Sequence, residues 1–458
     1  MPNSNDASVA HATPPLTSRE QARRVRRVAG ASLIGTAIEN YDFFIYGTAA
    51  ALVFNGLFFT GTDPSVATIA TFTVFAAGFL ARPLGAVIFG SFGDRIGRKS
   101  MLVATILIMG GATAAIGILP TQAAIGAWAP LLLVLLRVVQ GIAAGGEWGG
   151  AALMTVEHAP EARRGFFGGF TQAAIPIAFI LANLVFVPLT LLLTDGQLTS
   201  WGWRIPFLAS IILVGVGVFM RLKVTESPVF ETVRKEHRSE RAPFREVLRS
   251  QSGTVLLTSL VVAATTAIGY IKNVYFLSYT TQILHVDRTV VLLAILVNAV
   301  VEIALTVAFA HLSDRFGRRT VFLFGAMFSA VWAMPFFLLA AGGTFGLILF
   351  ALLGSGVGST AMFGPLAALI AEKFRAEVRY TGASLGYQIG STLGGGFAPL
   401  ISAALFAATG SVIAISVYVI GLCAVSGIAS FFVGETRGTS IAYKATAVST
   451  ITSQEGKL

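Results

Sequence analysis

Charged residues are scarce in this chain. Only 12% of its 458 residues are Asp, Glu, Lys or Arg, whereas 55% are hydrophobic and the mean hydropathy is +0.78. A soluble domain carries about 25% charged residues. The composition therefore excludes a soluble multidomain enzyme, and it also excludes an intrinsically disordered chain. A polytopic membrane protein remains, and the 49 glycines suit close helix packing in lipid.

Other absences narrow the function further. The one cysteine, Cys423, lies in an apolar run, which excludes an internal disulfide and a cysteine-based metal cluster. The five histidines show no metal-like spacing, and the chain has no P-loop and no G-x-S-x-G motif. We therefore expect no enzyme, no metal and no cofactor. Residues 1–27 carry a basic run and precede an apolar stretch too long for a secretory signal, so an uncleaved first membrane helix is expected.

Twelve apolar runs are long enough to cross a membrane, which takes ~20 residues for ~30 Å of hydrocarbon. They lie near 28–58, 66–91, 101–120, 127–155, 165–194, 203–222, 253–284, 289–312, 320–341, 344–371, 380–408 and 411–433. The sequence therefore predicts an all-α polytopic membrane protein with twelve transmembrane helices. The expected organisation is a tail over 1–27, six-helix bundles over 28–222 and 252–433, a charged linker with short helices over 223–251, and a tail over 434–458.

The basic residues are distributed unevenly between the loops. Of the 32, 27 fall in the two tails, the even-numbered loops and the linker, and the odd-numbered loops hold only Arg204 and Arg288. Cytoplasmic loops are enriched in Lys and Arg. Both termini are therefore expected in the cytoplasm, and the net charge of +10 reflects membrane topology rather than binding of nucleic acid.

One loop sequence occurs twice. GSFGDRIGRKSML (90–102) and AHLSDRFGRRTVFL (310–323) each follow the second span of their half, and Asp94 and Asp314 occupy the same place in the two copies. Two equivalent loops indicate a duplicated architecture. A carboxylate at such a helix end can pair with arginine or face the positive end of another helix, and that contact must break if the halves move. The predicted gating residues are Asp94, Arg95, Arg98, Asp314, Arg315 and Arg318.

The alternative interpretation of these loops is a solvated anchor of topology. The second copy also departs from the first, because Ala310 and Ser313 stand where the first has Gly90 and Gly93. The first loop is therefore the stronger candidate for a latch between the halves.

Seven ionisable residues lie inside the apolar runs, and each costs at least ~2.5 kcal/mol at the bilayer centre unless it is paired or hydrated. They are Glu39, Asp42, Arg82, Arg137, Glu147, Lys272 and Glu302. With a helical rise of ~1.5 Å per residue, the first four lie near the middle of the membrane. Glu39 and Asp42 share one helix face, and repulsion between two carboxylates favours a proton on one of them. Both are predicted proton-coupling residues; the alternative is permanent ion pairing with the arginines.

Polar residues at similar depth are candidates for substrate contact. The guanidinium of Arg137 suits a carboxylate, whereas Arg82, where Pro83 favours a bend, can bind an anion or hold Glu39. Two arginines near the middle of the membrane favour a small organic anion. The predicted substrate-binding residues are Arg137, Arg82, Tyr41, Gln172, Lys272, Asn273, Tyr387 and Gln388. Hydrogen bonding between helices is the alternative for the neutral ones, and Glu302 can be a buried partner of Lys272.

The repeated loop resembles the signature loop of the major facilitator superfamily, and RVVQG at 137–141 resembles its second signature. The segments GTAIENYDFFIYG, ARPLGAVIFG, GGEWGGAAL, WGWRIPF and ESPVF resemble the metabolite:proton symporter branch, which includes shikimate, 2-oxoglutarate and proline/betaine symporters. GGEWGGAAL and GYQIGSTLGGGFAP look most like the shikimate type. The resemblance implies two six-helix bundles around a central cavity, a carboxylate at the position of Asp42, and a location in the plasma or inner membrane.

We therefore expect proton-driven uptake of a small polar metabolite by alternating access, with a shikimate-like organic anion as the first candidate. A zwitterionic osmolyte is the second candidate, although the tail over 434–458 lacks the heptads of osmosensory members. An uncoupled facilitator or a membrane sensor would also fit the sequence. The expected partners are the substrate, protons and the lipid bilayer, and the expected state is a monomer.

Overall fold

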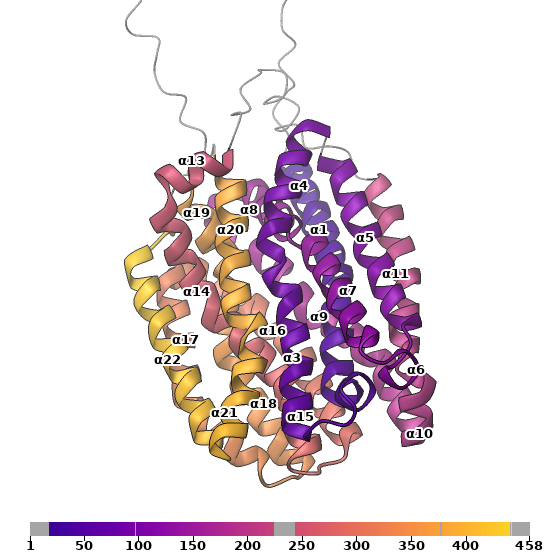
Figure 1. The fold of residues 1–458 in the computed structure, drawn as a ribbon. Coiled ribbons are helices and arrows are strands. Elements are labelled where there is room, and N and C mark those ends of the chain that lie inside the picture. The colour runs from indigo at the N-terminus through magenta and orange to yellow at the C-terminus, as the bar shows by residue number, and fades with distance from the viewer. Residues whose placement is uncertain (1–17, 97, 224–242, 376–377, 440, 442–458) are drawn as a thin grey trace, which may run out of the picture.

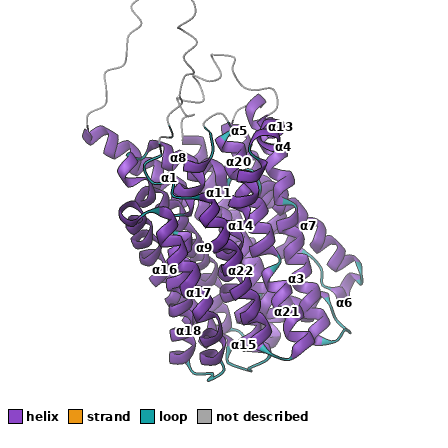
Figure 2. Cartoon of the chain, turned by 90° about the vertical axis from the view of Figure 1, so that its left-hand side faces the viewer, coloured by secondary structure: helices purple, strands orange, loops and turns teal. Residues whose placement is uncertain are grey.

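The computed structural model describes residues 18–96, 98–223, 243–375, 378–439 and 441. Within these ranges every regular element is a helix (Figure 2). The long helices run side by side along one direction (Figure 1). Ten of the described helical stretches are long and apolar enough to span a membrane. A bent pair over residues 195–219 can form an eleventh span, and the shorter apolar helix Val103–Ile118 stands in the place of the twelfth predicted span. The predicted fold class is confirmed.

The elements up to residue 223 are called the N-terminal half. They are α1 (Ser18–Ala49), η1 (Ala50–Phe54), α2 (Asn55–Phe58), α3 (Pro64–Leu80), α4 (Arg82–Ile96), α5 (Arg98–Ile118), α6 (Gln122–Ile125), α7 (Trp128–Ala144), α8 (Trp148–His158), η2 (Glu161–Arg163), α9 (Arg164–Leu192), α10 (Asp195–Gln197), η3 (Leu198–Gly202) and α11 (Arg204–Lys223).

The elements from residue 243 are called the C-terminal half. They are α13 (Pro243–Ser250), α14 (Ser252–Tyr270), η4 (Ile271–Tyr275), α15 (Phe276–Gln282), α16 (Arg288–Phe316), α17 (Arg318–Ala340), α18 (Phe345–Phe363), α19 (Leu366–Lys373), α20 (Arg379–Ser391), η5 (Thr392–Gly396), α21 (Ala398–Thr409) and α22 (Val412–Val433). Most of the linker for which short helices were expected, residues 224–242, lies outside the described residues.

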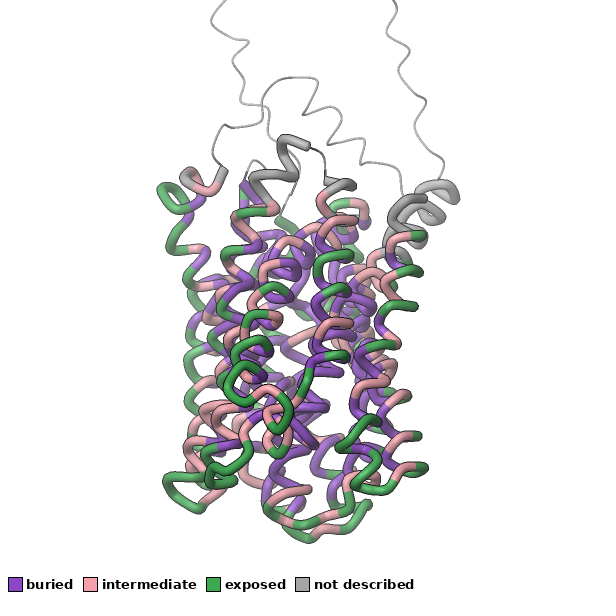
Figure 3. Tube along the Cα trace, turned by 45° about the vertical axis from the view of Figure 1, so that its right-hand side comes forward, coloured by how far each residue is buried: buried purple, intermediate pink, exposed green. Residues whose placement is uncertain are grey.

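Figure 3 shows exposed residues along the outward-facing sides of the helices, and many of these residues are large and hydrophobic. On α22, for example, Val417, Ile428 and Phe432 are 61%, 61% and 68% exposed. Large contiguous apolar surface is not tolerated on a soluble monomer. In a bilayer the same surface contacts lipid chains, so the exposure pattern agrees with the membrane location that the composition predicts.

The two halves lie next to each other and meet along two long contacts. α9 packs against α16, and α3 packs against α21 and η5. α20 adds contacts to α4 and α8 at one end. In Figure 1, α5, α7 and α11 lie on one side of these contacts and α14, α17 and α22 on the other. The end of the molecule that carries α13 is called the α13 end, and the opposite end, which carries α15, is called the α15 end.

Interruptions in the helices recur at equivalent places in the two halves. The π-helical segments η1 and η4 begin at Ala50 and Ile271, each in the first span of its half. The span α7–α8 breaks at residues 145–147, and the span α18–α19 breaks at Gly364 and Pro365. A break frees backbone carbonyls that an uninterrupted helix would satisfy. The duplication therefore reproduces the local irregularities as well as the loops, and these breaks lie beside the site.

Glycines set how closely α3 and α4 approach α7. A Cβ on Gly145 would overlap the carbonyl oxygen of Arg82, and a Cβ on Gly78 would lie 3.0 Å from a guanidinium nitrogen of Arg137. Small residues allow transmembrane backbones to approach in this way. Gly145 thus lets the backbone at Arg82 lie against the end of α7, and Gly78 leaves room for the guanidinium of Arg137.

Candidate functional site

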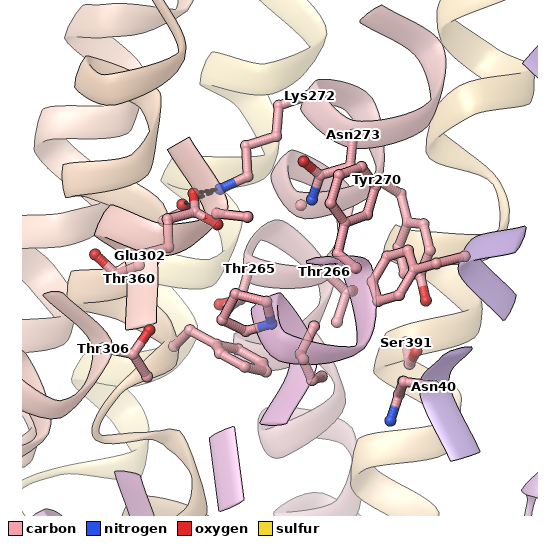
Figure 4. Close-up of a pocket in the computed structure, with 18 of the residues that line it drawn as sticks. Asn40, Thr265, Thr266, Tyr270, Lys272, Asn273, Glu302, Thr306, Thr360 and Ser391 are labelled. Carbon is pink, nitrogen blue, oxygen red and sulfur yellow. Dashed lines mark hydrogen bonds and ion pairs between the residues drawn. The ribbon is translucent and has the colours of Figure 1, made fainter. Parts of the chain in front are cut away.

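A small cavity of about 70 Å³ lies between the two halves and takes its lining from both of them (Figure 4). The N-terminal half supplies α1, α4 and α9, and the C-terminal half supplies α14, η4, α16, α18 and α20. The polar lining residues are Asn40, Arg82, Thr265, Thr266, Tyr270, Lys272, Asn273, Glu302, Thr306, Ser359, Thr360, Tyr387 and Ser391. Four of the eight predicted substrate-binding residues are among them, namely Arg82, Lys272, Asn273 and Tyr387.

Arg82 is the cation that the N-terminal half contributes to the cavity. Its guanidinium carbon lies 3.8 Å from the ring centroid of Phe43 and 4.0 Å from that of Phe79. It also lies close to Tyr270 across the boundary between the halves. A guanidinium stacked on aromatic faces keeps a fixed plane and presents its N–H groups in one direction. Arg82 is therefore oriented to receive an anion in the cavity.

Lys272 is the cation that the C-terminal half contributes. It lies in η4, is 3% exposed, and forms an ion pair with Glu302 of α16. The Lys272 ammonium also donates to the hydroxyl of Ser359 at 2.9 Å. Figure 4 shows Lys272 and Glu302 pointing toward each other at the side of the cavity. The pairing that the sequence left as an alternative for Glu302 is present.

Arg137 lies outside the residues that line the cavity. It is fully buried, donates to the side chain of Gln140 at 2.9 Å, and places its guanidinium carbon 3.9 Å from the ring centroid of Tyr46. Among the described residues it forms no ion pair with a carboxylate. Arg137 therefore serves the packing of α7 against α1 and α3, and a direct grip on substrate has no support from this geometry.

Asp42 is 3% exposed and also lies outside the cavity lining. Its carboxylate lies beside the hydroxyl of Thr113, which accepts a hydrogen bond of 2.6 Å from Gln140. Gln140 is in turn the partner of Arg137. Asp42 thus ends a buried polar chain behind the cavity, whereas Glu39, 7% exposed, lies near the cavity residues Tyr270 and Tyr387.

Two of the predicted residues join the halves instead of lining the cavity. Gln172 of α9 donates to the carbonyl of Phe363 at 3.3 Å, and Gln388 of α20 donates to the carbonyl of Gly145 at 3.2 Å. Each carbonyl belongs to the end of a helix that breaks in the opposite half. The two bonds form an equivalent pair, which we call the glutamine pair.

The remaining predicted residues occupy structural positions. The hydroxyl of Tyr41 donates to the carbonyl of Pro206 on α11 at 3.0 Å, away from the cavity. Glu147 is 2% exposed and stands in the break before α8. Sequence reasoning missed Asn40 and Tyr270. Asn40 was detectable, because it is a polar side chain between Glu39 and Asp42, whereas nothing in the sequence separates Tyr270 from other buried tyrosines.

The halves are joined on both sides of the cavity. At the α13 end Arg379 pairs with Glu157 at 3.2 Å, and Tyr380 donates to the carbonyl of Gly146 at 2.9 Å. At the α15 end Gln282 donates to the carbonyl of Ala51 at 2.8 Å, and Arg288 pairs with Asp195 at 2.6 Å. The halves are thus joined at both ends, an arrangement that we call the occluded form, and opening to either side requires that one set of contacts breaks.

Asp314 makes the most direct gating contact. Its two carboxylate oxygens accept the backbone N–H groups of Gly165 and Phe166, each at 2.8 Å, in the first turn of α9. Arg318, 1% exposed, holds the same carboxylate at 2.6 Å. A helix N-terminus of one half thus receives a charge from the other half. Arg315 accepts a hydrogen bond at its carbonyl from Arg437.

The side chains of Asp94, Arg95 and Arg98 lie outside the described residues. The latch contact was predicted more strongly for the first copy of the repeated loop, but the structure shows it at the second copy, at Asp314. Ala310 and Ser313, the residues that depart from the first copy, lie at this contact, because a Cβ on Gly169 would overlap the Cβ of Ala310 and a Cβ on Gly165 would lie 2.7 Å from the Ser313 hydroxyl.

We expect Asp314→Asn to slow turnover severalfold while changing equilibrium binding of substrate by less than threefold. The amide keeps the shape but loses the charge at the α9 N-terminus, so the form closed at the α13 end loses stability. A conformational equilibrium shifts binding only by its differential affinity for the two forms. Turnover in proteoliposomes and labelling of cysteines introduced at each end, in a variant without Cys423, measure both. Wild-type turnover with unchanged labelling would make Asp314 a topology anchor only.

Comparison with known proteins now identifies the family. The family model described as Major Facilitator Superfamily matches residues 32–399 and 264–449. The chain belongs to the major facilitator superfamily. It is therefore a membrane transporter rather than an enzyme.

Proteins named as transporters match this chain over most of their length and most of its own. The inner membrane metabolite transport protein YhjE of Escherichia coli strain K12 is 42% identical over 435 residues, covering 93% of this chain and 97% of YhjE. The shikimate transporter of the same strain is 39% identical, covering 90% and 95%. A putative proline/betaine transporter of Staphylococcus aureus strain COL is 31% identical, covering 87% and 85%. The predicted resemblance is confirmed.

Solved structures support the fold independently. The proton:xylose symporter XylE bound to 6-bromo-6-deoxy-D-glucose superposes with a TM-score of 0.74 at 17% identity, covering 92% of this chain and 98% of XylE. At this identity the likeness extends to the fold alone. The twelve-helix architecture is therefore that of this superfamily.

Proposed function

We propose that the protein takes up a small organic anion together with protons by alternating access, with both termini in the cytoplasm. The observation that carries the proposal is the cavity charge: Arg82 and Lys272, one from each half, line one cavity whose described charged residues include a single carboxylate, Glu302. The lining therefore has an excess of positive charge in a place where only a small molecule fits. The shikimate transporter among the relatives carries a substrate of this class by its name.

The proposed mechanism uses the contacts at the two ends. Opening at the α15 end admits the anion to Arg82, closure produces the occluded form, and opening at the α13 end releases it. Asp42 and Glu39 are the proposed proton carriers, because they are buried carboxylates on α1 and Asp42 lies within electrostatic reach of Arg137. The proton gradient of the cell membrane drives the cycle. We propose a monomer that needs no cofactor and no partner beyond substrate, protons and lipid, and that binds no nucleic acid.

A zwitterionic osmolyte is the second candidate. The rings of Phe44, Tyr270 and Tyr387 line the same cavity, and aromatic faces attract quaternary ammonium groups. The proline/betaine relative is consistent with this alternative. The paired charges of Lys272 and Glu302 also suit a ligand that carries both signs.

Uptake by proteoliposomes separates the candidates. Radiolabelled shikimate, 2-oxoglutarate, benzoate, proline and betaine are supplied with an inward proton gradient, without one, and with a protonophore. We expect one of the three acids to accumulate above equilibrium only with the gradient. Accumulation of proline or betaine alone would establish the second candidate, and equilibration of an acid without accumulation would establish an uncoupled facilitator.

A further inference from the structure

The ion pair of Lys272 and Glu302 lies in the wall of the cavity and not behind it. Both residues line the cavity, and they come from different helices, η4 and α16. Lys272 is 3% exposed and Glu302 is 5% exposed. In the described part of the chain Glu302 accepts only from Lys272, although a carboxylate can accept about four hydrogen bonds. The pair is therefore desolvated and incompletely hydrogen-bonded.

The neighbours of Glu302 leave room for a different arrangement. Asn298 and Thr306 lie one turn before and after it on the same face of α16, and within the described structure the Asn298 amide and the Thr306 hydroxyl have no hydrogen-bond partner. Gly356 of α18 faces them, and a Cβ there would lie 2.9 Å from Asn298 Oδ1 and 3.2 Å from Glu302 Oε1. Glu302 thus has polar groups to which it can turn if it leaves Lys272.

The other charged and titratable groups around the pair are few. Arg82 of α4, Tyr270 of α14 and Tyr387 of α20 line the same cavity. The cavity residues of α9 are Ile175, Pro176 and Phe179, and those of α18 are Ser359, Thr360 and Phe363, all uncharged. On α17, which also packs against α16, the described charged residues are Arg318 and Arg319 at its start. Glu302 is the one carboxylate among the described lining residues, and Glu39 of α1 lies nearby, close to Tyr270 and Tyr387.

We propose that an anionic substrate displaces Glu302 from Lys272, and that Glu302 takes up one proton as it is displaced. The inference rests on the proposed anion uptake and adds a coupling site in the C-terminal half, separate from Asp42. On binding, the ammonium of Lys272 exchanges the Glu302 carboxylate for that of the substrate. A proton from water forms an O–H bond on Glu302, whose carboxyl group then donates toward Thr306 or Asn298. Release of the substrate reverses both steps.

Electrostatics makes the two events interdependent. A carboxylate buried without a partner is strongly unfavourable, so Glu302 does not leave Lys272 as an anion. Conversely, a charged Glu302 neutralises Lys272 and repels a second carboxylate from the same place. Anion and proton therefore bind together, and the coupling is reciprocal. The same exchange explains how an ion pair and a binding site occupy one place.

Isothermal titration in buffers of different ionisation enthalpy counts protons taken up per bound acid. The protein in nanodiscs is titrated with shikimate, 2-oxoglutarate and benzoate at several pH values. We expect Glu302→Gln to take up about one proton fewer than wild type on binding the acid. The loss of affinity for the acid per unit rise in pH should then be about tenfold smaller in the variant than in wild type. Glu302→Asp, which retains a carboxyl group, should restore the proton. Lys272→Met should lower affinity for the acid at least tenfold.

The matched control is Asp287→Asn. Asp287 caps the start of the same helix, accepting from the N–H of Thr289 at 2.8 Å, and an amide caps equally well. It should leave the proton count unchanged. Thermal unfolding shows whether each variant is folded. If Glu302→Gln is unstable because the buried Lys272 ammonium has lost its partner, the double variant Lys272→Met/Glu302→Gln removes that charge as well.

The outcomes distinguish this inference from the proposed function. If wild type binds an acid with proton uptake that Glu302→Gln and the double variant retain in full, the inference is overturned and the proposed function stands. If wild type binds an acid without proton uptake, the inference is overturned, whereas the proposed function is decided by gradient-driven accumulation. If wild type binds none of the acids, both are overturned.

Discussion

Replacing Asp42 with asparagine should abolish uphill accumulation of the substrate while exchange of internal for external substrate continues. Asp42 is buried and lies outside the cavity lining, beside Thr113. The amide has the same shape, so the cavity and its cations keep their places. It cannot bind and release a proton at neutral pH, so the gradient no longer drives the cycle. The accumulation ratio is expected to fall to about one, with exchange within a few-fold of wild type.

Counterflow and gradient-driven uptake in the same proteoliposomes measure the two activities. Asp63→Asn is the control, because Asp63 caps α3 at the surface by accepting from the N–H of Ser65, and asparagine caps as well. Normal accumulation by Asp42→Asn, at normal insertion in the membrane, would remove Asp42 from the coupling mechanism. Loss of both activities would instead show that Asp42 is needed for the fold or for movement of the halves.

Replacing Arg82 with lysine should weaken substrate binding at least tenfold, which corresponds to about 1.4 kcal/mol. Lysine retains the charge but loses the planar fork, its stacking on Phe43 and Phe79, and the fixed direction of its donors. Arg82 also lies close to Tyr270 of the other half, and the substitution changes this contact. Equilibrium binding to the protein in nanodiscs gives the affinity directly, without a contribution from the transport cycle.

Arg137→Lys provides the comparison, because Arg137 is the second buried arginine of the same half and lies outside the cavity lining. Its loss should disturb the packing around Tyr46 and reduce turnover more than affinity. An unchanged dissociation constant for Arg82→Lys, or a larger loss of affinity for Arg137→Lys, would reverse the roles assigned to the two arginines.

The fold was predictable because each span is an apolar run whose length matches the bilayer, and because the repeated loop gives the register of the duplication. The depth of the charged residues was also predictable, since an α-helix has a constant rise along its axis. The direction of each side chain was not. Arg82 and Arg137 were placed at the same depth, and both stack on aromatic rings of their own half, yet only the first is among the residues that line the cavity. That direction depends on how neighbouring helices pack, which one sequence does not contain.

Contacts between helices that are distant in the sequence were the second feature that the sequence alone did not predict. Lys272 and Glu302 stand in separate spans of the C-terminal half, so their pairing was only one alternative. Gln172 and Gln388 were expected at the substrate, because a polar side chain in an apolar run fits either a ligand or a helix partner. The helix breaks at residues 145–147 and 364–365 expose the carbonyls that these glutamines bind, and the glycine content alone does not locate such breaks.

The glutamine pair has a consequence for the opening of the α13 end. Each half gives one amide donor and receives one at an equivalent carbonyl, so the two bonds are interchanged by the relation between the halves. Both carbonyls stand at breaks next to α8 and α19, toward the α13 end (Figure 1). A rotation that opens this end therefore lengthens both bonds together, whereas a rotation that opens the α15 end leaves them in place. The glutamine pair thus adds to the contacts that must break before the α13 end opens, and it lets the two halves share that cost equally.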